Sequence, residues 1–499
     1  MQLAKLAVVF APLVLALGCG GGGMGSSGGS GGGGSNPASE TIVISKATNG
    51  TFSVAMSTSF QPAEWDDQFF TLNPTATTTL GTLGTHHIRL QGVSQGVPQS
   101  TASTWNFSIL DAITQPVLSV GDHSPEFQIA VAPAFMYDAN HNFLDPTYQQ
   151  FAAYAQDLVR YYNIPGGFSA PDGQHASPSG IPITWWGIYN EPNFNNLKST
   201  QYTQLYNSVV PAMRAVDPSL KYAAVELGDY SGLANQFLPA FVSGVTAHVD
   251  VLATHFYSTC DQKDSDTTLF ATVPGFATEV GDIYTELHTN PALSSVPVWV
   301  TENNVNADYE GANGMSTCNP GQTFVDDQRG SSPFFAAWRP YVFSQLGKAG
   351  VEALYHWDFG ADQQYGEVDY GTGALQLSYW VDYWLGQEFP SPPGATVLQY
   401  TATDDAELET LPVVNSDGSV VVMVANHAVN AAGDNNGPGA ARSVQVDVSA
   451  LGTFSRGSLL MIDKNTSASS GPTAAAMTPA AQMTITLDGY AVAFLTLKP

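Results

Sequence analysis

Short apolar runs alternate with longer segments of helical periodicity from about residue 50 to residue 390, and this alternation restricts the fold more than any other feature. The runs comprise residues 51–60, 86–90, 127–135, 183–190, 221–227, 249–257, 297–303 and 353–359. Runs that are apolar at nearly every position suit strands buried on both faces of a parallel sheet. Several intervening segments place apolar side chains three and four residues apart, which predicts amphipathic crossover helices.

Two folds are compatible with strands and helices that alternate in this way. Eight strands with helical crossovers favour a closed barrel. A doubly wound open sheet is the alternative, but no Gly-rich phosphate loop follows any of the runs. We therefore predict an α/β fold, with a (β/α)8 TIM barrel over residues 41–390. Residues 41–48 could instead add a strand to the domain that follows.

The C-terminal part of the chain has a different sequence pattern, which begins after a Pro-rich segment at residues 390–394. Short β-type runs at residues 419–426, 443–448, 457–463 and 483–497 are separated by Gly, Asn and Ser. This pattern predicts an all-β sandwich domain over residues 395–499. We expect this domain to support the barrel structurally, because its β-type runs hold few aromatic side chains that could stack on sugars. Sugar binding is the alternative.

The N-terminal segment is predicted to be a targeting sequence. Residues 1–19 contain Lys5, a short apolar run and then Cys19, which is typical of a lipoprotein-type signal peptide with Cys19 lipidated after cleavage. Residues 20–40 are rich in Gly and Ser and predict a flexible tether. We expect a secreted protein of the bacterial cell envelope, lipid-anchored at the outer surface or in the periplasm. A plainly secreted protein is the alternative.

The charge and the cysteine content of the chain limit which binding partners and cofactors we expect. The chain has 43 acidic and 15 basic residues and a formal net charge of −28, which disfavours nucleic acid and anionic membrane surfaces and leaves the lipid anchor as the predicted membrane contact. In an exported chain, Cys260 and Cys318 are a candidate disulfide, with two free thiols as the alternative. No Cys/His cluster has the spacing of metal ligands, so we predict no metal and no organic cofactor.

Two glutamates fall where barrel enzymes carry their chemistry. Glu191 follows the fourth run and Glu302 follows the seventh, and the C-terminal ends of barrel strands converge on one mouth. A pair of carboxyl groups, one protonated and one ionised, can cleave a glycosidic bond. A separation of about 5–5.5 Å would give retention of configuration, and about 6.5–9.5 Å would give inversion.

These motifs resemble clan A of the glycoside hydrolases, which has an Asn-Glu pair after strand four and a Glu after strand seven. The sequence motif WWGIYNEPN and the C-terminal β domain are most similar to those of family 39, which includes β-xylosidases. The resemblance implies that Glu191 is the acid/base and Glu302 the nucleophile. It also implies supporting roles for Asn190 (sugar 2-hydroxyl), Arg89 (ionisation of the nucleophile), Tyr257 (contact with the nucleophile, in a His-x-Tyr motif that begins at His255) and Trp357 (floor of the sugar site).

The surroundings of these glutamates suggest how their roles would differ. Arg89 is expected to lower the pKa of Glu302 and keep it ionised, whereas Trp185 and Trp186 are expected to surround Glu191 and keep it protonated. Two further carboxylates, Glu226 and Asp358, are plausible walls of the site. The tryptophans Trp65, Trp105 and Trp185 are candidates for stacking on sugar, with simple packing as the alternative.

The sequence therefore predicts a retaining glycoside hydrolase that cleaves β-glycosidic bonds of poly- or oligosaccharides. The alternative is a non-catalytic, glycan-binding surface lipoprotein on a hydrolase-like barrel.

Overall fold

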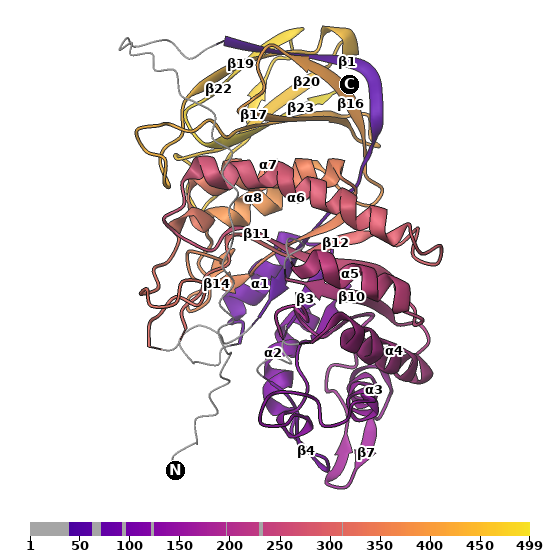
Figure 1. The fold of residues 1–499 in the computed structure, drawn as a ribbon. Helices are drawn as coiled ribbons and strands as arrows, with labels where there is room; N and C mark the ends of the chain where they lie inside the picture. The colour runs from indigo at the N-terminus through magenta and orange to yellow at the C-terminus, as the bar shows by residue number, and fades with distance from the viewer. Residues whose placement is uncertain are drawn as a thin grey trace.

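The computed structural model describes residues 39–61, 71–91, 96–120, 124–195, 197–228, 233–311 and 313–499. They form a closed barrel of eight parallel strands with surrounding helices and a separate nine-stranded sheet, which confirms the predicted fold class. Figure 1 shows the second sheet stacked on one side of the barrel, beyond helices α6, α7 and α8. The predicted signal peptide with Cys19, and the predicted tether as far as residue 38, lie outside the described residues.

The barrel closes because its first strand pairs with both the second and the last. Its strands are β2 (Ala55–Phe60), β3 (Ile88–Leu90), β6 (Glu126–Ile129), β9 (Trp185–Ile188), β10 (Lys221–Leu227), β11 (Val251–Thr259), β12 (Val298–Asn306) and β13 (Val351–His356). Small two-stranded sheets lie in the connections, formed by β4 (Gln99–Thr101) with β5 (Thr104–Trp105), β7 (Phe168–Ala170) with β8 (Gly173–His175), and β14 (Gly360–Ala361) with β15 (Val368–Asp369).

Helices cover the outside of the barrel. They are α1 (Pro74–Leu83), α2 (Ser108–Ser119), α3 (Gln149–Asn163), α4 (Ser199–Val216), α5 (Leu233–Gly244), α6 (Asp266–Leu287), α7 (Pro333–Lys348) and α8 (Leu377–Glu388), with 3-10 turns η3 (Ala134–Met136), η4 (Gln328–Ser331) and η5 (Ser449–Leu451). Within the described ranges, none of the helices has the length and apolar character needed to cross a membrane.

Two of the predicted runs are longer than the barrel strands that they contain. The run at residues 51–60 holds the end of a sandwich strand, and the barrel strand β2 begins only at Ala55. The run at residues 127–135 leaves the sheet after Ile129, and Ala134–Met136 forms the turn η3. Pro133 lies before this turn, and a proline has no backbone N–H to donate to a sheet ladder.

The N-terminal end of the barrel interior is filled with side chains. Trp185 and Trp299 meet with their ring centroids 4.4 Å apart and pack with small residues of neighbouring strands, such as Ala223 and Ala253. His87 covers Trp299 at 4.6 Å. This end of the barrel is therefore a packed core, and the polar interior side chains gather toward the opposite end.

The second domain contains the N-terminal strand as well as the C-terminal ones. Its strands are β1 (Ser39–Phe52), β16 (Ala395–Ala402), β17 (Leu408–Val414), β18 (Val420–Asn426), β19 (Arg442–Asp447), β20 (Arg456–Ile462), β21 (Ala475–Met477), β22 (Gln482–Leu487) and β23 (Ala491–Lys498). Strand β1 pairs antiparallel with β16 and parallel with β19. The run at residues 483–497 forms two strands rather than one, because Gly489 turns the chain with a φ of 101°.

The two faces of the nine-stranded sheet have different partners. On β18, Val422 and Val424 enter the core of the sandwich, where Ile44 and Ile485 join them from other strands. Their alternating neighbours Val421 and Met423 belong to the same apolar cluster as the barrel helices. Alternation along β18 therefore builds the sandwich core on one side and the contact with α7 on the other.

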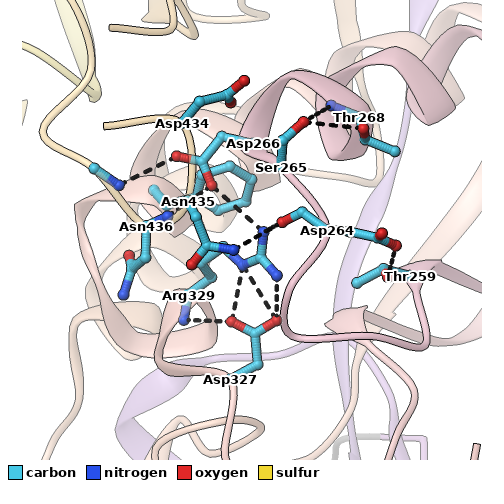
Figure 2. Close-up of polar contacts among 12 residues, drawn as sticks. Thr259, Asp264, Ser265, Asp266, Thr268, Asp327, Arg329, Asp434, Asn435 and Asn436 are labelled. Carbon is cyan, nitrogen blue, oxygen red and sulfur yellow. Dashed lines mark hydrogen bonds and ion pairs between the residues drawn. The ribbon is translucent and has the colours of Figure 1, made fainter. Parts of the chain in front are cut away.

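A polar cluster, which we call the interdomain clamp, ties barrel loops to the sandwich (Figure 2). It consists of Asp266, Asp327, Arg329, Asn436 and Tyr490. The backbone N–H of Asn436 donates to Asp266 at 2.8 Å and the hydroxyl of Tyr490 does so at 3.0 Å. Arg329, which is fully buried, contacts Asp266 at 3.4 Å and Asp327 at 2.7 Å.

A disulfide lies next to the clamp. Cys260 follows β11 and Cys318 follows β12, and the bond joins them with a Cα–Cα distance of 5.7 Å. The amide of Asn319 also donates to the backbone carbonyl of Cys260 at 2.7 Å. The loops that follow two neighbouring barrel strands are therefore held together covalently.

Candidate active site

The two glutamates that the sequence singles out lie together at the C-terminal end of the barrel. One carboxylate oxygen of Glu191, one of Glu302 and a ring nitrogen of His255 all lie within 4.8 Å of one another. The side chain of Glu302 is only 7% exposed, whereas that of Glu191 is 25% exposed. The pair is therefore open to solvent on the Glu191 side and enclosed on the Glu302 side.

Glu302 is held by three neighbours. Arg89 donates to Oε1 at 2.9 Å, the hydroxyl of Tyr257 donates to Oε2 at 3.0 Å, and Nδ1 of His255 lies 3.4 Å from Oε2. His255 is placed there by the pairing of β11 with β12, which sets it opposite Glu302. The carboxylate is thus fixed from both sides.

The pKa of Glu302 is raised overall, so the expected net lowering was wrong, although Arg89 itself acts in the expected direction. Burial is the largest cause of the increase. His255 and Arg89 act in the opposite direction, and the neighbouring carboxyl of Glu191 adds to the increase. The cost of removing the whole carboxylate from water outweighs the attraction of two cations.

Glu191 sits in a tight turn after β9. Its φ is 42° and that of Tyr189 is 68°, and both values lie in the left-handed region that non-glycine residues rarely adopt. The backbone N–H of Glu191 donates to the carbonyl of Glu226 at 3.0 Å, and its carboxylate meets Nδ1 of His255 at 2.9 Å. Strained backbone of this kind is concentrated at functional sites.

The expected tryptophan surroundings of Glu191 are not found. Trp186 is fully buried, and its indole donates to the carbonyl of Ile183 and packs on Phe127. Trp185 lies at the N-terminal end of β9, whereas Glu191 follows the C-terminal end. A strand that runs through the barrel separates residues six positions apart by most of its depth.

Glu226 lies beneath the pair and links its cations. Its Oε2 lies 3.3 Å from Arg89 and 3.3 Å from Nε2 of His255, and it accepts a hydrogen bond from Thr301 at 2.6 Å. Burial alone would raise the pKa of Glu226, but Arg89, His255 and Thr301 together hold it at about 2. Glu226 is therefore a permanent anion at neutral pH.

His255 is a permanent cation under the same conditions. Burial alone would lower its pKa, but the carboxylates of Glu302, Glu191 and Glu226 raise it to about 9. Its two ring nitrogens face Glu191 and Glu226, so both can donate. The imidazolium connects the exposed glutamate with the buried one.

A further buried glutamate of the site is Glu126, which the sequence analysis did not predict. Burial and the neighbouring Glu226 raise the pKa of Glu126 well above its usual range. The approach of the two carboxyls requires a glycine, because a Cβ at Gly187 would lie 3.0 Å from Glu226 and 3.2 Å from Glu126. A neutral Glu126 can therefore donate a hydrogen bond to the ionised Glu226.

Asn190 and Trp357, predicted to bind the sugar, lie beside this network. The side-chain oxygen of Asn190 accepts from Arg89 at 3.0 Å and from Gln128 at 3.0 Å. Trp357 lies at the end of β13, with the guanidinium of Arg89 6.0 Å from the centre of its ring. The structure thus brings together Glu191, Glu302, Asn190, Arg89, His255, Tyr257 and Trp357.

The remaining candidates lie elsewhere. Trp185 packs in the core at the N-terminal end of the barrel interior, and Trp105 packs on Phe107 and Tyr154. The prediction that these two rings stack on sugar was therefore wrong. Asp358 is buried and accepts backbone hydrogen bonds from residues 61 and 360, which makes it a structural support. Trp65 lies outside the described residues.

Among the described residues, two groups have donor atoms close enough to hold a metal ion. The first is Glu191, His255 and Glu302, and the second is the fully buried set His356, Glu367 and Asp382. In each group both histidine ring nitrogens face oxygen atoms: His255 faces two glutamates, and His356 faces Asp382 at 2.7 Å and the carbonyl of Tyr365 at 2.6 Å. Hydrogen bonding therefore accounts for the arrangement of both groups.

The fold and the paired carboxyls together define a (β/α)8 barrel with an acidic site at its mouth. No family model and no curated protein matches the sequence. The fold is similar to a family 30 glycoside hydrolase endoxylanase from Clostridium papyrosolvens, with a TM-score of 0.57, 14% identity, and coverage of 93% of this chain and 100% of that chain.

Two further solved structures have the same arrangement. A family 39 β-xylosidase from Caulobacter crescentus has a TM-score of 0.59 and 14% identity, over 92% of this chain and 100% of that chain. An arabinofuranosidase has a TM-score of 0.64 and 11% identity, over 92% of this chain and 100% of that chain. At these identities, the similarity establishes a shared fold, of the kind that the resemblance to clan A predicts.

Proposed function

We propose that this protein is a retaining glycoside hydrolase, with Glu302 as the nucleophile and Glu191 as the acid/base. The observation that carries the proposal is the approach of the two carboxyls, with one oxygen of each within 4.8 Å of the other. This upper limit lies well below the ~6.5–9.5 Å at which inverting enzymes hold a water molecule between their carboxyls, and it supports the retaining mechanism, whose carboxyls lie ~5–5.5 Å apart.

In the first step, a carboxylate oxygen of Glu302 forms a bond to the anomeric carbon. The bond from this carbon to the leaving oxygen breaks, and Glu191 gives its proton to that oxygen. The different exposures of the two side chains support these roles: the half-open Glu191 can meet a departing group, while Arg89 and Tyr257 hold Glu302 in place.

The charges of the network support the second step. With Glu126 neutral, the ionised Glu226 and Glu302 balance Arg89 and His255. When Glu302 becomes an ester, one positive charge is left without its partner. Glu191, which gave up its proton in the first step, then takes a proton from the incoming water while Glu302 is released as a carboxylate that restores the balance.

The substrates that we propose are poly- or oligosaccharides with β-glycosidic bonds. Solved structures with a similar fold include an endoxylanase, a β-xylosidase and an arabinofuranosidase, and Asn190 is available for a sugar 2-hydroxyl. We also propose that the protein is exported and anchored through Cys19, on the basis of the lipobox-like sequence and the tether.

Activity of point variants on a panel of aryl β-glycosides tests the proposal. We expect Glu302→Ala and Glu191→Ala each to lower kcat by about 10²–10⁴-fold or more, with added azide restoring turnover and yielding glycosyl azides. Wild-type rates in both variants would contradict the assignment. Saturable binding of a glycan by the wild-type protein without any product would favour the non-catalytic alternative.

A further inference from the structure

The most exposed large apolar side chains of the described residues lie in loops that follow barrel strands. They are Leu144 after β6, Val325 after β12 and Phe194 after β9, with exposures of 60%, 54% and 48%. The loops after barrel strands surround the site. Phe194 is the one aromatic residue of the three, and it lies only three positions after Glu191.

The ring of Phe194 and the carboxylate of Glu191 both lie close to Gly228, which is on the neighbouring loop. A Cβ at Gly228, just after β10, would lie 2.5 Å from Cδ2 of Phe194 and 2.8 Å from Oε1 of Glu191. Gly228 therefore has to be a glycine for the ring and the carboxylate to lie where they do. The aromatic side chain is part of the immediate surroundings of the acid/base and is not a distant surface residue.

The turn that carries Phe194 is held by several hydrogen bonds. The backbone N–H groups of Phe194 and Asn195 donate to the carbonyl of Glu191 at 2.9 and 3.0 Å. The side chain of Asn195 donates to the carbonyl of Asn190 at 2.9 Å, and Asn193 accepts from the N–H of Gly228 at 3.1 Å. A ring on such a turn is presented in a restricted position, so little conformational freedom is lost when a ligand covers it.

We propose that Phe194 is the stacking platform for the sugar ring on the leaving-group side of the scissile bond. The inference rests on the proposed function, because it takes Glu191 as the residue that protonates the leaving oxygen. A sugar that departs past Glu191 passes the ring beside it. The C–H groups on one face of a pyranose carry partial positive charge, and they fit the electron-rich face of an aromatic ring.

The two sides of the site then differ in chemistry. On the Glu302 side, the groups are charged or hydrogen-bonding, as in Arg89, Tyr257 and Asn190. On the Glu191 side, an exposed apolar ring offers contact area without directional hydrogen bonds. The leaving-group site therefore accepts a sugar by its shape and apolar face, and tolerates variation in its hydroxyl groups.

The same platform would hold an acceptor sugar once the glycosyl ester on Glu302 has formed. A hydroxyl of the acceptor then attacks the anomeric carbon in place of water, Glu191 takes its proton, and Glu302 leaves as a carboxylate. Hydrolysis and transfer to an acceptor sugar break and form the same kinds of bond. The fraction of the ester that reacts by transfer therefore depends on how often an acceptor sugar occupies the platform.

Paired substrates test the proposal. β-1,4-Xylo-oligosaccharides and cello-oligosaccharides have a sugar leaving group, whereas β-xylosyl fluoride and β-glucosyl fluoride have the same glycone without one. We expect Phe194→Ala to lower kcat/KM on the oligosaccharides about tenfold, which corresponds to ~1.4 kcal/mol. The same variant should keep the kcat/KM of the fluorides within about twofold, since the fluoride ion cannot cover the ring.

Two further variants serve as controls. Phe194→Trp keeps an aromatic face and should retain the activity on oligosaccharides. Ile164→Ala removes an apolar side chain of 36% exposure at the C-terminal end of α3, where the helices reach the barrel end opposite the site, and should behave as wild type on both kinds of substrate.

A second readout is reactivation of the enzyme after trapping with a 2-deoxy-2-fluoroglycosyl fluoride. Xylobiose or cellobiose should speed reactivation of the wild type in a saturable manner, with about a tenfold weaker half-saturation in Phe194→Ala. Equal losses on fluorides and oligosaccharides, or no loss on either, would overturn the platform while leaving the hydrolase intact. A wild-type protein that turns over neither these substrates nor any aryl β-glycoside of the panel would overturn the proposed function itself.

Discussion

The molecule contains two buried networks in which carboxyl groups surround an arginine, and they differ in how their carboxyls are held. In the interdomain clamp, Oδ1 of Asp266 accepts from Asn436 and Oδ2 accepts from Gly437 and Tyr490. In the site, four glutamates share two cations, and the pKa values of Glu126 and Glu302 are both raised. The clamp carboxylates accept hydrogen bonds from backbone, tyrosine and arginine donors, whereas two carboxyls of the site have raised pKa values.

This difference indicates what each network does. A satisfied network of buried charges orients the elements that it joins, and loss of one member leaves another charge without a partner. A buried carboxyl of raised pKa costs stability when it is ionised, but it can hold a proton for transfer. We therefore expect changes in the site to affect catalysis and changes in the clamp to affect folding.

The largest effect is expected for Glu302→Gln. Loss of the proposed nucleophile should lower kcat by on the order of 10⁴-fold or more. Because its pKa is raised in the folded protein, the ionised Glu302 costs stability at neutral pH, so its neutral replacement should leave the melting temperature unchanged or higher. Thermal unfolding of both proteins at pH 7 measures this, and a clearly lower melting temperature would show that the site is a stabilising network like the clamp.

The disulfide beside the clamp should have the next largest effect. Cys260 and Cys318 are 58 positions apart, and loss of a crosslink that closes a loop of this size costs about 4 kcal/mol in the chain-entropy account. We expect a double Cys260→Ser, Cys318→Ser variant to unfold at lower denaturant concentration. Its kcat should be retained at temperatures below its transition, and an unchanged denaturation midpoint would contradict the prediction.

A comparable loss is expected within the clamp for Asp266→Asn. Arg329 keeps its ion pair with Asp327, but the new amide cannot accept the hydrogen bonds that Gly437 and Tyr490 donate to Oδ2 of Asp266. Each hydrogen bond to a charged group contributes about 1.5–3 kcal/mol. The matched control is Asp434→Asn in the same cluster, which binds Thr267 near the surface and should cost under about 1 kcal/mol. Equal denaturation midpoints for the two variants would show that the clamp does not join the domains energetically.

The smallest effect is a pH dependence of stability that comes from His255. Its pKa is raised to about 9 from an ordinary value of about 6.5, so the charged imidazole stabilises the folded protein below about pH 6.5. This contribution, on the order of 3 kcal/mol, is lost as the pH rises through about 9. The difference in unfolding free energy between wild type and His255→Gln should therefore shrink from pH 6 to pH 10, and a constant difference would contradict the charge assignment.

Several parts of the site could have been found with a finer interpretation of the strands. Glu126 and Gln128 stand two positions apart at the third predicted strand, and alternate residues of a barrel strand face the same side. This spacing was the available signal for a polar interior layer. The signal was missed because the surrounding residues are apolar and favoured a strand buried on both faces.

Other errors had no such signal. Trp185 and Glu191 are close in sequence, but they lie at opposite ends of β9 because an extended strand rises ~3.3 Å per residue. The importance of Phe194 also became visible only when Gly228, more than thirty positions later, was found beside its ring. Contacts between separate loops of a barrel depend on closure of the sheet, which local patterns do not describe.

The sequence by itself determined the alternation that builds the barrel, the change to a β domain, and the position of Glu191 and Glu302 after the fourth and seventh strands. These are local properties, since periodicity and the residue at the end of a strand need no knowledge of distant partners. Tertiary structure decided the direction of the pKa shift of Glu302, the charge of His255 and the neighbours of Glu191. Burial and the sum of nearby charges are set by segments that meet only when the barrel has closed.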